Sequence, residues 1–216
     1  MQTLTEAIIA AGRRESILTE AQLARLLDGS AQRRYNLVNR ALHSGELIRL
    51  RRGRYRLATP IAGKPPHPFV VAQALRSGSY ISLESALSFH GLIPEAVPST
   101  QSIVPGRRGD ECSIPDLGVF LFRPLALNPG YFLESVERVM LNGQAALVAR
   151  PLRALLDRCC LLKLDWPGLD ALLDSLRIDP DDLARLPRDE LETLKPVYRH
   201  QRLRSLIDAM QQEWAA

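Results

Sequence analysis

Apolar side chains in the first 45 residues recur every three or four positions, which is the spacing of one helix face. This pattern predicts three helices whose inward-facing residues are, in turn, Leu4, Ala7, Ile8 and Ala11; Leu23, Leu26 and Leu27; and Ala31, Tyr35, Val38 and Leu42. Thr19 followed by Gln22 has the form of a capping box and marks the start of the second helix. Ser30 can cap the third, which we expect to run from Ala31 to about Ser44 and to end at Gly45.

The period then changes to two, which is typical of strands. Leu47–Arg51 and Arg54–Leu57 predict two short strands around a turn at Arg52 and Gly53. In this alternation the inward-facing residues are Ile48, Leu50, Tyr55 and Leu57, and the outward-facing residues are Arg49, Arg51 and Arg56. Three helices followed by a two-stranded hairpin is the order of a winged helix, in which a helix-turn-helix carries a β-wing.

A proline-rich segment divides the chain. Thr59–Pro68 holds four prolines and one glycine, which disfavour the interior of both helices and strands. We therefore expect an N-terminal winged helix-turn-helix domain over residues 1–60, a linker over residues 61–68 and a second domain over residues 69–216.

The second domain mixes helical and strand patterns. Helices are predicted at Pro68–Arg76, Ser82–His90 and Pro151–Leu164, and strands at Gln101–Val104, Val119–Phe122 and Ser135–Met140. Asn142-Gly143 predicts a hairpin turn between Val136–Leu141 and Ala145–Ala149. The tail from Gly168 to Trp214 reads as helical, with Asp179 or Asp181 as a cap. The expected fold class is α+β: a winged helix-turn-helix, then a mixed α+β domain with a helical tail.

Positive charge is concentrated in the first domain. The whole chain carries +4, but residues 1–60 hold eleven arginines and five carboxylates, which gives +6 and leaves −2 for the remainder. The stretch Arg33–Ala58 alone contains eight arginines and no lysine, and Glu46 is its single carboxylate. A basic module joined to a faintly acidic one indicates that the first domain meets a polyanion.

The third helix separates these charges from the core. When Val38 is placed at the centre of the buried face, Arg34 points toward the buried side, and the opposite face carries Arg33, Asn36, Arg40 and His43, flanked by Gln32 and Asn39. No carboxylate falls on this outward face. Arginine can pair with the O6 and N7 atoms of guanine, and asparagine or glutamine with the N6 and N7 atoms of adenine. We therefore expect these six outward side chains to contact DNA.

The hairpin adds a second set of arginines. Arg49 and Arg51 lie on its outward side, and Arg52 and Arg54 flank the tip at Gly53. A narrow arginine-bearing tip suits phosphate groups or an A·T-rich minor groove. Duplex DNA is favoured over RNA because a helix with a wing fits a major groove. A solvated basic surface and a protein-interaction module remain the alternatives.

Two segments of the second domain carry a resemblance to a known family. They are "YISLESALSFHGLIPEAVPS" (Tyr80–Ser99) and "ALVARPLRALLDRCCLL" (Ala146–Leu162). Together with the preceding winged helix they resemble the AbiEi-type antitoxins of type IV toxin–antitoxin systems, from about Leu18 to about Leu164. One departure is Arg153, which stands where the family often has lysine and keeps the charge.

The resemblance implies a transcriptional repressor of its own toxin–antitoxin operon. Its N-terminal domain would bind inverted repeats in double-stranded DNA, and two copies of a monomer or weak dimer would pair on one operator. The C-terminal domain would counter a nucleotidyltransferase-like toxin without forming a stable complex with it. The alternatives are an ordinary winged-helix transcription factor with a ligand-sensing second domain, and a protein-interaction adaptor.

Enzymatic chemistry is not indicated, and neither a metal nor a cofactor is expected. The four histidines lack metal-ligand spacing. Gly78-Ser79 is similar to the start of a nucleotidyltransferase motif, but the next carboxylate is Glu84 alone, without the pair that holds magnesium. Asp179–Asp182 is explained by helix capping, and Cys159 and Cys160 by burial in a core.

A second basic row lies near the C-terminus. It consists of Lys195, Arg199, His200, Arg202 and Arg204, and it suits either a solvated face or a surface for a partner or a DNA backbone. Three unpaired cysteines, no secretory signal and no apolar run of about 18 residues indicate a cytoplasmic protein without a membrane partner.

Overall fold

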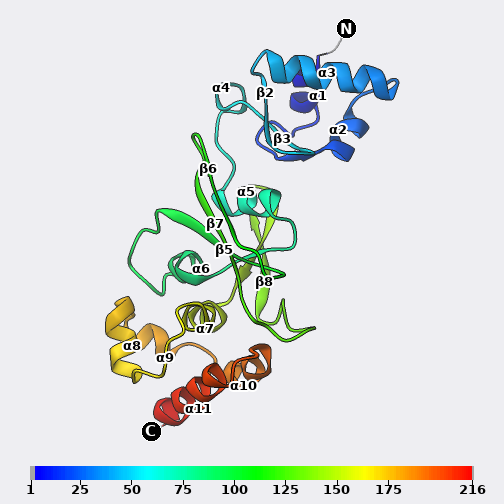
Figure 1. Cartoon of the computed structure of the whole chain (residues 1–216). Helices are drawn as coiled ribbons and strands as arrows, with labels where there is room; N and C mark the ends of the chain where they lie inside the picture. Colours follow the sequence, from blue (N-terminus) through cyan, green and yellow to red (C-terminus); the bar gives the residue numbers. More distant parts are fainter. Residues whose placement is uncertain (1–2, 216) are drawn as a thin grey trace.

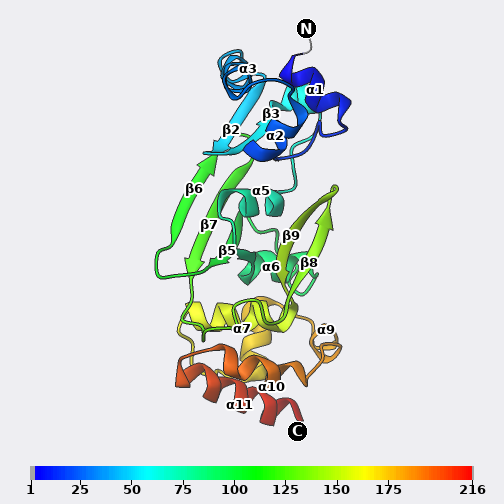
Figure 2. The same ribbon diagram turned by 90° about the vertical axis from the view of Figure 1, so that its right-hand side faces the viewer.

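The structure is a computed structural model that describes residues 3–215, and it has a mixed α+β fold (Figure 1). In both views the elements stack along one axis: an N-terminal unit of helices with a small sheet, then a larger sheet, then a layer of C-terminal helices (Figure 2). Two clusters of buried apolar residues correspond to this division, one in the N-terminal unit and a larger one in the remainder of the chain, to which Ile17 of the N-terminal unit also belongs.

From residue 3 to Leu57, the described part of the N-terminal unit contains three helices and three strands. In chain order they are α1 (Leu4–Ala10), β1 (Leu18–Thr19), α2 (Glu20–Leu26), α3 (Ala31–His43), β2 (Leu47–Arg51) and β3 (Arg54–Leu57). The strands form an antiparallel sheet in the order β1-β3-β2. The predicted helices and both hairpin strands are confirmed, whereas the two-residue strand β1 was not predicted.

Side-chain caps begin α2 and α3 as the sequence predicts. Thr19 accepts a hydrogen bond from the backbone N–H of Gln22 at 3.0 Å, and the Gln22 side chain accepts one from the Thr19 N–H at 2.8 Å. Ser30 accepts from the Arg33 N–H at 3.2 Å. These bonds satisfy N–H groups that have no partner within the helix.

The buried face of α3 is rotated from the predicted one. Leu37 and Ala41 are its most buried residues, and Val38 lies at the edge of the core. Tyr35, which was expected to face inward, is 63% exposed, and Ala31 and Ala11 are exposed as well. The prediction for Tyr35 and Ala31 is wrong because α3, which contacts α1 and β2, buries its Leu37 and Ala41 side. Ala11 is exposed because it stands at the C-cap, past the last turn of α1.

Two positions in the hairpin also differ from the expected alternation. Ile48 is exposed, whereas Arg56 is 3% exposed and donates to the Thr59 hydroxyl at 2.8 Å. The two residues are direct partners in the β2–β3 register and therefore share a face, opposite to that of Leu47. A bulge between Arg49 and Arg51 then shifts the period of two along β2.

The connection between the two units is partly helical, which corrects the expectation of an irregular segment from Thr59 to Pro68. Thr59–Ala62 forms α4, with Pro60 in its first turn, where a missing N–H removes no hydrogen bond. Ala62 packs in the core of the N-terminal unit. The irregular connection is thus confined to residues 63–67.

The second unit is built on a six-stranded sheet in the order β6-β7-β5-β4-β9-β8. Its elements are α5 (Pro68–Leu75), β4 (Tyr80–Ile81), α6 (Leu83–Phe89), β5 (Ser99–Val104), β6 (Asp110–Ile114), β7 (Gly118–Pro124), β8 (Val136–Leu141), β9 (Gln144–Ala149) and α7 (Pro151–Leu161). β5 runs parallel to β7, β4 runs parallel to β9, and the other neighbours are antiparallel. The predicted helices and strands are present, while β4 and β6 were not predicted.

The β8–β9 hairpin turns at Asn142 and Gly143, as the sequence predicts. Their φ angles are +50° and +75°, the left-handed region that a tight two-residue turn requires at both positions. The hairpin lies at the edge of the sheet.

The C-terminal tail is helical, as expected. It consists of α8 (Leu169–Leu176), α9 (Pro180–Ala184), α10 (Glu190–Leu194), the 3-10 turn η1 (Lys195–Val197) and α11 (Gln201–Ala215). Asp179 caps α9 by accepting from the Asp181 N–H at 2.8 Å. Among the described residues, no helix is both long and apolar enough to cross a membrane.

Direct hydrogen bonds join the two units. The Gln144 side chain accepts from the Ile17 N–H at 2.9 Å and donates to the Ile17 carbonyl at 3.1 Å. The hairpin tip also faces the second unit, because the Arg51 guanidinium donates to the carbonyl of Leu75 at the end of α5. Helix α3 lies on the other side of the N-terminal unit, away from the large sheet (Figure 1).

Candidate nucleic-acid interface

The outward face of α3 is polar and carries no carboxylate. Gln32, Asn36, Arg40 and His43 are exposed, and Asn39 is half-buried. Because the core lies on the Leu37 side, Gln32 and Asn39 belong to the middle of this face rather than to its flanks. We call these five residues the α3 face.

Short hydrogen bonds along the helix order the α3 face. The Gln32 side-chain amide donates to Asn36 Oδ1 at 3.1 Å, and His43 Nδ1 lies 2.7 Å from the carbonyl oxygen of Asn39. The Asn36 amide keeps its two N–H donors for another partner. The face is therefore preorganised, and it offers both donors and acceptors.

Arg33 differs from the other predicted residues of the third helix. Its guanidinium donates to the carbonyl of Asp28 at 3.1 Å, and its side chain crosses over Gly29, where an added Cβ would lie only 2.9 Å from Arg33 Cδ. Arg34, on the inner side of α3, donates to the carbonyl of Gly29. Both arginines thus hold the loop before α3.

The structure divides the four hairpin arginines that were predicted to contact DNA into two pairs. Arg49 and Arg52 are exposed, and within residues 3–215 their side chains form no hydrogen bond or ion pair. Arg51 donates to Leu75, and Arg54 Nη2 donates to the Ser77 hydroxyl at 3.4 Å. Only Arg49 and Arg52 are therefore free to meet a phosphate group.

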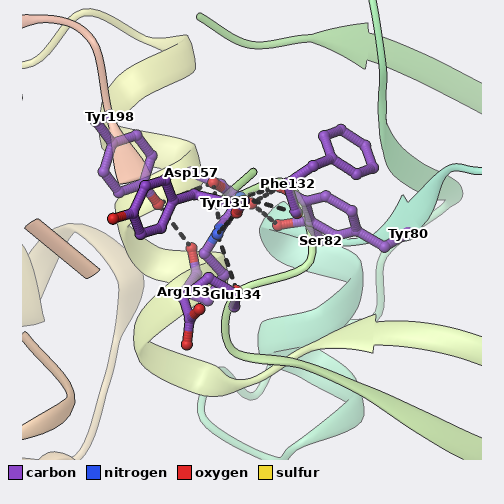
Figure 3. Close-up of polar contacts among 8 residues, drawn as sticks. All are labelled: Tyr80, Ser82, Tyr131, Phe132, Glu134, Arg153, Asp157 and Tyr198. Atoms are coloured by element: carbon purple, nitrogen blue, oxygen red, sulfur yellow. Dashed lines mark hydrogen bonds and ion pairs between the residues drawn. The ribbon is translucent and has the colours of Figure 1, made fainter. Parts of the chain in front are cut away.

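A buried ionic cluster in the second unit was not anticipated (Figure 3). The side chains of Arg153 and Asp157, one turn apart on α7, are 0% exposed and meet at 3.0 Å. Asp157 also accepts from the hydroxyls of Tyr80 at 2.9 Å, Ser82 at 2.7 Å and Tyr198 at 2.9 Å. These five residues, which we call the Arg153 cluster, come from three different parts of the chain: residues 80–82, helix α7 and Tyr198.

Arg153 also fixes the loop before β8. Its guanidinium donates to the Tyr80 hydroxyl at 2.6 Å and to the backbone carbonyl of Glu134 at 2.9 Å (Figure 3). Burial and the Asp157 carboxylate hold the pKa of Tyr80 well above its ordinary value. Because its donors and acceptors are paired with one another, the cluster is a structural clamp rather than a reactive site.

The sequence held a signal for this cluster. An arginine and an aspartate four residues apart on an otherwise apolar helix can form an ion pair, and burial of that helix buries the pair. Ser82 stands at the start of α6, but its side chain makes no capping bond and donates to Asp157 instead.

The cysteines on α7 are core residues, as expected. Cys159 is 1% and Cys160 6% exposed. Burial raises the pKa of Cys159 to about 11 and that of Cys160 to about 12. At neutral pH both are thiols, which are poor nucleophiles.

The basic row near the C-terminus does not act as one surface. Lys195 pairs with Asp208, and Arg204 Nη2 donates to the Arg199 carbonyl at 3.1 Å. Arg202 is half-buried. Arg199 is exposed, and its side chain has no polar partner within the described residues.

The second unit has several cavities, of which two are described here. One, of about 560 Å³, opens at the ends of β5 and β7 and includes Arg107 and Arg199 in its lining. The other, of about 530 Å³, lies between the start of β8 and α10 and includes Arg150 and Glu190. We call the first the strand-end cavity.

Fold and surface together define a two-unit α+β protein in which the smaller, N-terminal unit carries as many exposed arginines as the much larger second unit, within the described residues. The chain matches no protein-family model and no curated protein. Its functional assignment therefore depends on the surfaces described above.

Proposed function

We propose that this chain is a sequence-specific DNA-binding protein that represses its own operon and serves as the antitoxin of a type IV toxin–antitoxin system. The observation that carries the DNA-binding part is the α3 face, which is largely exposed and free of carboxylates, on a helix that lies away from the large sheet (Figure 1). A surface that serves only solubility normally mixes both signs of charge.

The N-terminal unit would act as a winged helix. The order helix, strand, helix, helix, hairpin and the sheet order β1-β3-β2 support this assignment. In such a module the second helix of the helix-turn-helix enters the major groove, which here is α3. The hairpin tip faces the second unit, so the hairpin would contact the DNA backbone only through the exposed side chains of Arg49 and Arg52.

Each candidate residue has a distinct part in this proposal. Base edges would be read by the α3 face: Gln32, Asn36, Asn39, Arg40 and His43. Arg49 and Arg52 would contact phosphates. Arg33, Arg51 and Arg54 would position the loop and the hairpin through the contacts they make within the protein.

The antitoxin part is supported by the sequence resemblance from about Leu18 to about Leu164. On this proposal the second unit counters a nucleotidyltransferase-like toxin without a stable complex, and the chain itself is not an enzyme. A second candidate is a winged-helix transcription factor whose second unit senses a small molecule. The strand-end cavity favours that reading.

A gel-shift titration tests the DNA-binding proposal. The purified full chain is titrated against the duplex immediately upstream of its own gene and against a random duplex of equal length, at about 0.15 M salt, where weak electrostatic binding is screened. We expect preference for the upstream duplex, with two copies bound per operator. Equal affinity for both duplexes would overturn the claim of specificity.

Co-expression tests the antitoxin proposal separately. The full chain is expressed with the toxin candidate encoded beside it, and growth is measured. We expect growth to be restored, and restored equally by an Asn36→Ala/Arg52→Ala variant that has lost operator binding. Growth arrest in the presence of a soluble, folded chain would contradict the antitoxin role.

A further inference from the structure

The strand-end cavity lies where two neighbouring parallel strands end. β5 and β7 pair in parallel from Ser99 with Val119 to Val104 with Pro124, so both carboxyl ends open on one side of the sheet. The residues after each strand, including Gly106, Arg107, Leu125 and Ala126, line the cavity. Crevices outside the carboxyl ends of parallel strands are common ligand sites in open sheets.

One wall of the cavity is fixed by the tail of the chain. The Arg199 N–H donates to the Ala126 carbonyl at 3.1 Å, and the Asn128 N–H donates to the Val197 carbonyl at 2.8 Å. The Asn128 side-chain amide adds a bond to the Pro196 carbonyl at 2.7 Å. The backbone of Arg199 is therefore held next to the end of β7.

The charges of the cavity are of one sign. Arg107 and Arg199, 92 positions apart in the sequence, line it together, and its lining contains no aspartate or glutamate. Neither guanidinium has a hydrogen bond or ion pair within residues 3–215. Two unpaired guanidinium groups at one cavity suit an anion with several acceptor oxygens, and the planar fork of arginine fits phosphate well.

The remaining walls are mainly apolar. Val104, Leu125, Leu127 and Phe132 contribute to them, together with three prolines. The volume of about 560 Å³ falls within the range of small-molecule sites, roughly 300–1,000 Å³. An apolar wall suits a flat or hydrophobic body, such as the face of a purine base, because burying such a surface breaks no hydrogen bond to water.

We propose that the strand-end cavity binds a phosphorylated small molecule with an apolar or aromatic body, of the size of a mononucleotide. Arg107 and Arg199 hold the phosphate groups, and the side of the cavity that carries Leu125 and Phe132 contacts the body. This site is separate from the DNA-binding surface, because it lies in the second unit and shares no residue with the α3 face.

Isothermal titration calorimetry on the purified full chain tests the proposal without DNA. The probes are the 5′-monophosphates and triphosphates of adenosine and guanosine, with adenosine, guanosine and inorganic phosphate as partial ligands. We expect at least one nucleotide to bind with a Kd below about 1 mM and at least about tenfold tighter than its nucleoside or phosphate alone. No nucleotide binding at that level would overturn the proposal, as would equal binding of inorganic phosphate.

Variants locate the site. Arg107→Ala and Arg199→Gln should each weaken nucleotide binding about tenfold or more, because each removes a charge-assisted bond, and the double variant should weaken it further. Arg138→Ala is the matched control: it removes an exposed arginine of β8 that does not line the cavity. Unchanged thermal unfolding of the variants confirms their fold. Binding that survives in the double variant, or falls equally in the control, would refute this location.

Discussion

At the scale of single residues, the most constrained charge is that of Arg153. Its guanidinium carbon lies 5.2 Å from the ring centre of Tyr80 and 5.5 Å from that of Tyr198, with Asp157 in direct contact. Burying two ions has a large desolvation penalty, which their attraction and hydrogen bonds offset only while both partners are present. Losing one partner leaves a buried charge without compensation.

Arg153→Met should therefore lower the free energy of unfolding by about 3–5 kcal/mol, measured by urea denaturation. The double variant Arg153→Met/Asp157→Leu should recover much of that loss, because no isolated charge remains. Arg153→Lys keeps the positive charge but not the planar guanidinium group. It should lower the free energy of unfolding by less, about 1–2 kcal/mol. A loss below about 1 kcal/mol for Arg153→Met would contradict the clamp role.

The cysteines give a second test at this scale. With pKa values of about 11 and 12, Cys159 and Cys160 carry almost no thiolate at pH 8, and both are buried. A thiol reagent at pH 8 should label at most one group per native chain quickly, the partly exposed Cys112, and two more only after unfolding in urea. Cys112→Ser is the control and should abolish the fast phase. Equal labelling rates for all three cysteines in the native protein would contradict the burial of Cys159 and Cys160.

At the scale of elements, α3 and the hairpin predict different effects on DNA binding. Asn36→Ala should relax the preference at one base pair and reduce discrimination there by about 1–3 kcal/mol. Arg52→Ala should weaken all duplexes about equally and reduce the slope of log affinity against log salt by about one. The DNA affinities of both variants are measured by gel shift over a range of salt concentrations.

Arg54 provides the matched control for Arg52. Both flank Gly53, but Arg54 donates to Ser77 of the second unit. Arg54→Ala should therefore leave the salt slope closer to that of the unaltered chain than Arg52→Ala does. If Asn36→Ala and Arg52→Ala both lower only general affinity, α3 does not read bases.

Helices and strands could be predicted from the sequence where they were long enough to show a regular apolar pattern. The strands β2 and β3 and the three N-terminal helices each hold enough residues for a period to be visible. β1 and β4 have only two residues each and exist because β3, β5 and β9 lie beside them. β6 reads Asp-Glu-Cys-Ser-Ile, which shows no apolar alternation, and it forms as an edge strand paired with β7.

At the scale of the whole molecule, the contacts that dock the two units against each other are distinct from those that stabilise each unit. Gln144 makes two hydrogen bonds to the backbone of Ile17, and Arg51 and Arg54 reach α5 and the residues after it. Such polar contacts hold orientation more than they add stability, since each is worth about 1 kcal/mol net.

Gln144→Ala combined with Arg51→Ala should therefore loosen docking while the total stability changes by only about 1–3 kcal/mol. The measurement is limited digestion by a protease of broad specificity, such as proteinase K, within the irregular connection over residues 63–67, where Gly63, Lys64 and Pro65 are exposed. Cleavage should become several-fold faster than in the unaltered chain. Gln212→Ala, at an exposed position of α11, is the control. An unchanged cleavage rate would mean that other contacts maintain the docking.

The sequence by itself determined the local features: the capping box at Thr19, the hairpin turns, the periods of most helices and strands, and the concentration of arginine around α3. These depend on neighbouring residues, whose spacing is fixed by the backbone. Only the tertiary structure decided which arginines are free, because Arg33, Arg51 and Arg54 bond to carbonyl or hydroxyl groups that folding brings near them. It likewise brought Asp157 to Tyr198, and Arg107 to Arg199, because long-range packing and strand pairing, rather than sequence distance, set those separations.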